Sequence, residues 1–254
     1  NRYVHRLQTA LAASMKEGVV YEMDTRLRPS GRSGPPTVSL ESFAHYQLER
    51  AKTWEHQALV TARPVKGDPE TAARMMEIRR ATLTRRRSPH QLVMDARKML
   101  ERLRAQRIHG HSDRVISTKL RKGGLMEAEY LVSFTVLLLG ADMPHLADLD
   151  YPELVTAVAL ELQLEMLPGI LRFWRVLQIW ERLLGLEGLD VDELPSRFCS
   201  TILDQLGVES TTELATRTGL YCAQISTSLD TMLALSPEDE SALAAWAEQP
   251  IKWQ

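Results

Sequence analysis

At 254 residues and a net charge of -2, the chain is long enough for one large domain or two of ordinary size, and its composition is that of a globular protein. No apolar run reaches the eighteen or so residues of a membrane span, and the longest, near residues 131–139, is about half that length. No secretory signal opens the chain, and two cysteines make no disulfide framework or metal-ligand spacing, so we expect a cytoplasmic protein.

The charge is divided unevenly along the chain. Residues 1–125 hold 25 of the 31 Lys and Arg but 12 of the 33 Asp and Glu, a net charge of +13. Residues 126–254 hold the other 6 basic and 21 acidic residues, a net charge of -15. This division indicates either that the basic part binds an anion, such as a nucleotide or nucleic acid, or that the two parts neutralise each other where they meet.

The apolar spacing predicts a helix over residues 2–15 and then a strand over residues 19–28. If the strand reaches Arg28, its period of two puts Glu22, Asp24, Arg26 and Arg28 on one face. Carboxylates bind hard cations and arginine forks bind phosphoryl oxygens, so this face suits a metal ion beside a phosphate. The same spacing is also that of a solvated strand face with ordinary ion pairs.

Three helix starts follow, each marked by a capping residue. We expect one helix from Ser39 to about residue 62, with Trp54 in the core and Arg63 at its end, where it can reach an anion. The starts at Asp68 and Ser88 open two more helices. The second of these has a basic face that would suit nucleic acid, but the absence of interleaved aromatic side chains disfavours single-strand binding.

A second strand is expected over residues 115–120, with a turn at Lys122-Gly123-Gly124 into a helix that ends near residue 139. A Gly-Gly pair before a helix lets backbone amides approach a phosphate. The helix is apolar almost all round, so Glu127 and Glu129 in its first turn need a reason. One reason is compensation of the helix dipole, and another is a role in a binding site.

From Gly140 onward the sequence predicts only helices, over about 151–167, 168–184, 195–206, 212–235 and 238–247. Their apolar residues would fill the interior of a bundle. The core positions expected are Leu154, Val158, Leu162, Phe173, Leu177, Trp180 and Leu184. This part shows no catalytic constellation, so we expect a scaffold or docking domain.

Three motifs in order resemble one known family. They are Y-E-M-D-T-R-L-R-P-S-G at residues 21–31, T-W-E-H-Q-A-L at residues 53–59 and K-G-G-L-M-E-A-E-Y at residues 122–130. Together they look like the glutamine synthetase adenylyltransferases, which add AMP to glutamine synthetase and remove it. The family pattern has I-E-F where this chain has A-E-Y, a departure that keeps the carboxylate. The residues of the first two motifs are closer to those of the C-terminal copy of the family's duplicated domain, which is the copy that adds AMP.

The resemblance implies a fold that is mainly α with a small β part. A truncated nucleotidyltransferase domain of the DNA polymerase β type, with its helical insert, would occupy residues 1–135, and a C-terminal helical bundle residues 136–254. Asp24 would be catalytic and bind Mg²⁺. Arg26, Arg28, Arg63 and Lys122 would contact the phosphates of ATP. Glu22, Glu127 and Glu129 would bind the metal or support its ligands.

The implied activity is transfer of AMP from ATP to a tyrosine of glutamine synthetase, with glutamine synthetase and the PII signalling protein as partners. The family's other two metal-binding aspartates lie in an upstream G-S-D-x-D motif, and no such motif precedes Asp24 in the printed sequence. We therefore expect the chain to be inactive alone. The alternatives are the copy that removes AMP by phosphorolysis and a helical module that binds nucleic acid.

Overall fold

The computed structural model describes residues 2–13, 23–25, 27–105, 115–118, 121–186, 188–190, 194 and 196–234. It divides into two compact units, residues 1–83 and 84–254, and each is described by itself. The described residues are mostly helical with one small sheet, which confirms the expectation of a mainly α fold with a small β part. No helix in these ranges is both long and apolar enough to cross a membrane.

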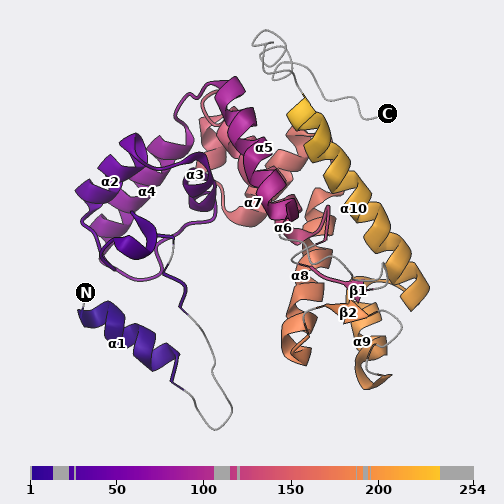
Figure 1. Cartoon of the computed structure of the whole chain (residues 1–254). Helices are drawn as coiled ribbons and strands as arrows, with labels where there is room; N and C mark the ends of the chain where they lie inside the picture. The colour runs from indigo at the N-terminus through magenta and orange to yellow at the C-terminus, as the bar shows by residue number, and fades with distance from the viewer. Residues whose placement is uncertain are drawn as a thin grey trace. The chain divides into compact units, whose positions relative to one another are not determined.

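The first unit contains helices α1 (Arg2–Leu11), α2 (Leu40–Glu49), α3 (Thr53–Leu59) and α4 (Pro69–Leu83), with a short 3-10 helix, η1 (Gly31–Ser33). Helices α2 and α3 both pack on α4 (Figure 1). The predicted caps at Ser39 and Asp68 are confirmed, because Ser39 Oγ accepts from the backbone N of Ser42 at 3.2 Å and Asp68 Oδ1 from that of Thr71 at 2.9 Å. These caps satisfy amides that the helices leave unpaired.

The prediction of one helix from Ser39 to residue 62 was wrong, because the chain breaks between α2 and α3. Arg50 and Ala51 both donate to the carbonyl of Tyr46, which closes α2. Glu55 then accepts from the backbone N of Lys52 at 2.9 Å and opens α3. The break turns Trp54 toward solvent, where it is 37% exposed, so its expected place in the core was also wrong.

The strand expected over residues 19–28 is absent from the described part of that segment. Residues 23–25 have no regular structure, and residues 27–30 form bends and a turn. A strand is stable only when a neighbouring strand satisfies its backbone groups, and the described residues place none beside this segment. Residues 14–22 and 26 lie outside the described residues.

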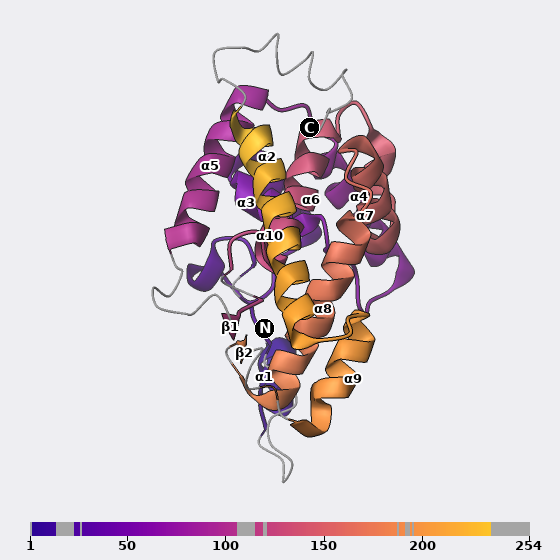
Figure 2. The ribbon, with the colours of Figure 1, turned by 90° about the vertical axis from the view of Figure 1, so that its right-hand side faces the viewer.

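The second unit is a helical bundle built around α6 (Leu125–Leu139). Helices α5 (Pro89–Ala105), α7 (Tyr151–Glu161), α8 (Leu167–Leu184) and α10 (Thr211–Ala234) pack against α6 (Figures 1 and 2). Helix α9 (Ser196–Leu206) packs on α8 and α10, and a short 3-10 helix, η2 (Pro144–Ala147), touches α6. The prediction that the helix after Gly124 is buried almost all round is confirmed.

The core of this bundle differs in part from the expected set. Leu154, Val158, Leu162, Phe173 and Leu177 are buried as expected. Trp180 and Leu184 are only half-buried, and the large aromatic residue at the centre of the bundle is Trp174, which is fully buried. Helix α7 ends at Glu161, six residues before the expected end, and Gln163 then takes a left-handed backbone conformation with φ 50°.

A two-stranded antiparallel sheet joins distant parts of the bundle. Strand β1 (Val115–Ile116) pairs with β2 (Leu189–Asp190), with Val115 opposite Asp190 and Ile116 opposite Leu189. The expected strand near residue 115 is therefore confirmed over two residues, while Lys119 and Leu120 lie outside the described residues. The expectation of helices alone after Gly140 was wrong, since β2 is too short to show an alternating pattern.

Candidate functional site

The residues predicted to form a site divide between the two units. Asp24, Arg28 and Arg63 lie in the first unit, and Lys122, Glu127 and Glu129 lie in the second. Glu22 and Arg26 lie outside the described residues. Within each unit, the structure shows how these side chains are held.

In the first unit, Asp24 is an exposed residue in a segment without regular structure. The guanidinium of Arg28 donates to the carbonyl of Thr25, the residue after Asp24, and at 3.4 Å to the carbonyl of Gly34. It therefore braces the turn over residues 28–34, in which Ser30 and Gly31 both have positive φ. Arg28 is thus half-buried, and its guanidinium is hydrogen-bonded to the backbone. A guanidinium that only bound phosphate would instead lie in solvent.

Arg63 is exposed and follows α3. The other polar residues of its motif are structural. Glu55 accepts a hydrogen bond from the hydroxyl of Tyr46 at 2.7 Å, and Nε2 of the buried His56 lies 2.9 Å from the carbonyl oxygen of Gln47. The buried Arg79 of α4 donates to the carbonyls of Leu59 and Val60 at 2.8 and 2.7 Å. The T-W-E-H-Q-A-L motif thus fixes α3 against α2 and α4.

In the second unit, Lys122 and Glu127 belong to one chain of ion pairs. Glu127, buried in the first turn of α6, accepts from Nε and Nη2 of Arg104 in α5 at 3.1 and 3.0 Å. Arg104 Nη1 donates to Asp230 Oδ1 of α10 at 2.9 Å, and Lys122 Nζ lies 3.3 Å from Asp230 Oδ2. This gives Glu127 a clear reason to be buried, because bidentate pairing with an arginine satisfies its charge.

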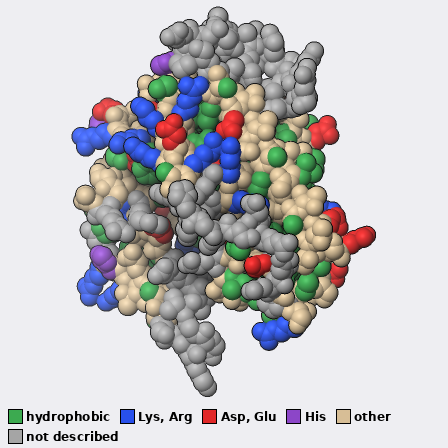
Figure 3. All heavy atoms as spheres, turned by 45° about the vertical axis from the view of Figure 1, so that its right-hand side comes forward, with side chains coloured by type: hydrophobic (Ala, Val, Ile, Leu, Met, Phe, Trp, Pro, Cys, Tyr) green, Lys and Arg blue, Asp and Glu red, His purple; other side chains and the backbone are tan. Residues whose placement is uncertain are grey.

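The pKa of Asp230 reflects this network. Burial acts to raise the pKa, but hydrogen bonds from Arg104 and Lys122 outweigh it and hold the pKa of Asp230 below its ordinary value. Asp230 was not among the predicted residues, because it lies more than a hundred positions from the motif that it contacts and no local pattern marks it. Figure 3 shows basic side chains gathered with acidic ones over the region of α5.

Glu129 belongs to a different cluster, on the side of α6 that faces α8. Its Oε1 accepts from Nη2 of Arg175 at 2.7 Å, and the same guanidinium lies 5.3 Å from the ring centre of Tyr151. Burial raises the pKa of Glu129, and the nearby Arg175 opposes that rise. Burial likewise raises the pKa of Tyr151.

The Gly-Gly turn packs against protein instead of lying open to a phosphate. Gly123 has φ 72°, and a Cβ atom added there would lie 2.0 Å from the backbone oxygen of Cys222 in α10. The backbone N of Leu125, at the start of α6, donates to the carbonyl of Thr118 at 3.2 Å. Thr118 in turn donates its own backbone N to Oε1 of Glu181 at 2.9 Å and its hydroxyl to Oε2. Helices α8 and α10 therefore hold the K-G-G-L motif in place.

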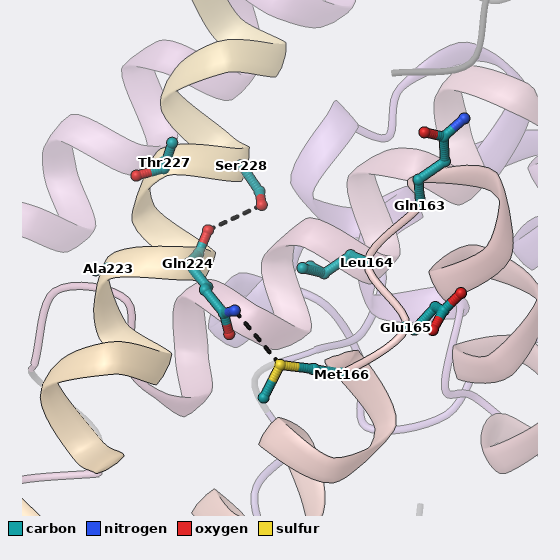
Figure 4. Close-up of a pocket in the computed structure, with 8 residues that line it drawn as sticks. All are labelled: Gln163, Leu164, Glu165, Met166, Ala223, Gln224, Thr227 and Ser228. Carbon is teal, nitrogen blue, oxygen red and sulfur yellow. Dashed lines mark hydrogen bonds between the residues drawn. The ribbon is translucent and has the colours of Figure 1, made fainter. Parts of the chain in front are cut away.

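One cavity of about 480 Å³ lies between the segment after α7 and the middle of α10. Figure 4 shows Gln224 of α10 reaching toward Met166, with its Nε2 3.5 Å from the sulfur. The other lining residues are Gln163, Leu164, Glu165, Ala223, Thr227 and Ser228. None of the predicted site residues lines this cavity.

The described residues do not by themselves make a metal centre. They contain no group of three or more His, Cys, Asp and Glu that could hold a metal ion. The carboxylate of Asp24 is the right kind of ligand for Mg²⁺, but the ion needs further oxygen ligands that the described residues do not bring together. The structure thus presents a helical protein whose motif residues are partly exposed, in the first unit, and partly fixed by ion pairs, in the second.

Comparison with known proteins finds similarity to one family over part of the chain. A family model described as glutamate-ammonia ligase adenylyltransferase matches residues 1–78, which include the first two motifs. Relatives called bifunctional glutamine synthetase adenylyltransferase/adenylyl-removing enzyme are 42% identical over 159 residues in Xanthomonas axonopodis pv. citri and over 140 residues in Methylococcus capsulatus. Over the matched part, the chain is thus similar to the glutamine synthetase adenylyltransferases, which confirms the resemblance seen in its motifs.

These alignments cover only part of each protein. The Xanthomonas alignment spans 62% of this chain and 17% of the relative, and the Methylococcus alignment spans 55% and 15%. The chain therefore spans less than a fifth of the length of these relatives.

Proposed function

We propose that the chain is part of an enzyme that transfers AMP from ATP to a tyrosine of glutamine synthetase. The observation that carries this proposal is the 42% identity to enzymes of that name together with the three motifs in their family order. The first 135 residues would be part of a nucleotidyltransferase domain, and the remaining helices would dock glutamine synthetase or the PII signalling protein.

In this proposal Asp24 provides one carboxylate for Mg²⁺, beside ligands that the described residues do not supply. Its exposure is compatible with that role. Arg63 and Arg26 would contact the phosphates of ATP. Arg28 would act mainly by shaping the turn after Asp24, because its guanidinium is bonded to the carbonyls of Thr25 and Gly34.

The test uses the full-length parent protein. The substitution Asp24→Asn should lower AMP incorporation into glutamine synthetase by at least about 100-fold, since it removes a charge at a site of phosphoryl transfer. The matched control is Glu70→Gln, which removes an exposed carboxylate in the first turn of α4 and should leave the rate unchanged. Equal rates for Asp24→Asn and the unaltered protein would contradict the assignment.

Removal of AMP is the second candidate, because the names of the relatives include an adenylyl-removing activity beside the adenylyltransferase. The two directions are separated by mixing the parent with adenylylated glutamine synthetase and inorganic phosphate. Release of ADP that depends on phosphate and is abolished by Asp24→Asn would assign this copy to removal. Such a result would replace the adding activity proposed above.

A further inference from the structure

The outward face of α8 carries an aliphatic row that lies in solvent. Ile179 is 55% exposed and Leu183 is 70% exposed, and the spacing of four residues puts them one above the other. Leu186, just past the end of the helix, is 43% exposed. Soluble proteins seldom leave neighbouring large apolar side chains in water without a use for them, because covering them is favourable.

Arginines line the same face. Arg172 lies seven residues before Ile179, in line with the aliphatic row, and Arg175 and Arg182 flank it. Arg175 is held by Glu129, whereas Arg172 and Arg182 form no ion pair with another residue in the described part of the chain. We call Arg172, Ile179, Arg182, Leu183 and Leu186 the α8 face.

The α8 face is basic, although residues 126–254 are acidic overall. Residues 126–254 contain 6 basic and 21 acidic residues, and three of those six basic residues lie on this one side of α8. An acidic protein segment would pair with the arginines while its apolar side chains cover Ile179 and Leu183. Electrostatic complementarity of this kind sets which partner is chosen and how fast it binds.

The rest of α8 is rigidly placed. Its opposite side buries Ile170, Trp174 and Leu177 in the bundle core, so α8 offers a fixed ridge with a single row of apolar side chains. Such a ridge fits the groove of another helix. A lipid surface needs a wider apolar face than one row on a helix whose other side is buried. The α8 face of a second copy would bring arginines together, which is unfavourable.

We propose that the α8 face is a docking site for an acidic amphipathic helix of a partner protein, one that presents leucine-like side chains in a row flanked by Glu or Asp. This inference rests on the exposed residues of α8 and is independent of the direction in which AMP is transferred. It assigns the docking role that we proposed for the helices after residue 135 to one face of α8.

The test measures fluorescence anisotropy of a labelled synthetic helical peptide with Leu at positions i, i+4, i+7 and i+11 and Glu on both flanks. We expect saturable binding to the 254-residue chain that weakens as salt is raised. The double variant Ile179→Ser/Leu183→Ser should weaken binding at least tenfold. The matched controls Leu160→Ser and Leu220→Ser remove leucines of similar exposure on α7 and α10 and should leave binding unchanged.

A charge exchange makes the test specific. The double variant Arg172→Glu/Arg182→Glu should no longer bind the acidic peptide, and it should bind the same peptide with Lys in place of Glu. Circular dichroism should show the same helix content for every variant, since all the altered side chains lie in solvent. Absence of binding by the acidic peptide, or equal loss with the control variants, would overturn the proposal.

Two other occupants would also overturn it. Anionic phospholipid vesicles that sediment the chain, together with no peptide binding, would assign the face to a membrane surface. Dimerisation that Ile179→Ser/Leu183→Ser abolishes, again with no peptide binding, would assign it to a second copy of the chain. Because both readouts use the chain alone, neither depends on transferase activity.

Discussion

The two units use the same kinds of charged residue in different ways. In the first unit, Asp24 and Arg63 are exposed, and the motif around residue 24 has no neighbouring strand among the described residues. In the second unit, Glu127 and Lys122 are joined through Arg104 and Asp230 into one network that links α5, α6 and α10. Charged residues of the same type therefore have different roles in the two units, because burial and neighbouring partners decide what a charged side chain does.

The largest effect on stability should come from Gly123→Ala. Its backbone has φ 72°, and the added Cβ would meet the backbone of Cys222, which cannot move aside as a flexible side chain would. We expect a loss of about 4 kcal/mol in the free energy of unfolding, measured by urea denaturation, from left-handed strain and overpacking together. Gly219→Ala is the control, since that glycine of α10 has open space and alanine there should stabilise the helix.

Glu127→Ala should come next. It leaves the partly buried guanidinium of Arg104 with one carboxylate in place of two, and we expect a loss of about 3 kcal/mol. The control is Glu129→Ala, which breaks a more exposed pair with Arg175 and should cost less than about 1 kcal/mol. Similar losses in the free energy of unfolding for the two variants would show that the Arg104 network is not what fixes α6. The charged residues of the second unit would then not be structural in the way that distinguishes them from those of the first unit.

The third prediction concerns pH. Burial raises the pKa of Glu181, while hydrogen bonds from Thr118 oppose that rise without cancelling it. A carboxyl whose folded pKa is raised contributes stability that is fully present below its unfolded pKa, 4.5, and is lost as pH rises through the folded pKa. The unfolding free energy of Glu181→Gln should therefore fall less between pH 4.5 and 7 than that of the unaltered chain. Parallel curves for the two proteins would contradict a raised pKa.

The smallest effect should come from the first unit. Asp24→Asn alters an exposed side chain, so the free energy of unfolding of the chain should change by less than about 0.5 kcal/mol. Under the proposed function, the same substitution should strongly lower AMP transfer by the full-length protein, which is the combination expected of a binding residue. A large loss of stability in the chain would instead indicate that Asp24 has a structural role, as Glu127 has in the second unit.

The sequence was informative where structure is decided locally. Capping residues Ser39, Asp68, Ser88 and Asp150 each mark a helix start, because the cap and the amide that it satisfies are three residues apart. The break before α3 was missed because its opening residue, Lys52, is not a usual cap. For the candidate site, the motifs drew attention to Asp24, Lys122 and Glu127, and their role in a site stays a prediction.

What the sequence could not show is which partner each charge has. Glu181 and Thr118 are 63 residues apart, and Arg104 and Asp230 are 126 apart, so no periodicity relates them. The pairing of β1 with β2 has the same origin, since each strand is only two residues long. These contacts arise from the packing of whole helices.

The contacts of α10 also bear on the order in which the chain can fold during synthesis. In the first unit, Arg79 reaches back only 20 residues to Leu59, so its contacts can form as soon as α4 has been made. In the second unit, Arg97 of α5 donates to the carbonyl of Leu233 at 2.7 Å, across 136 residues. The bundle therefore cannot close over α6 until α10 has left the ribosome, and until then α6, the most apolar of the described helices, needs protection from aggregation.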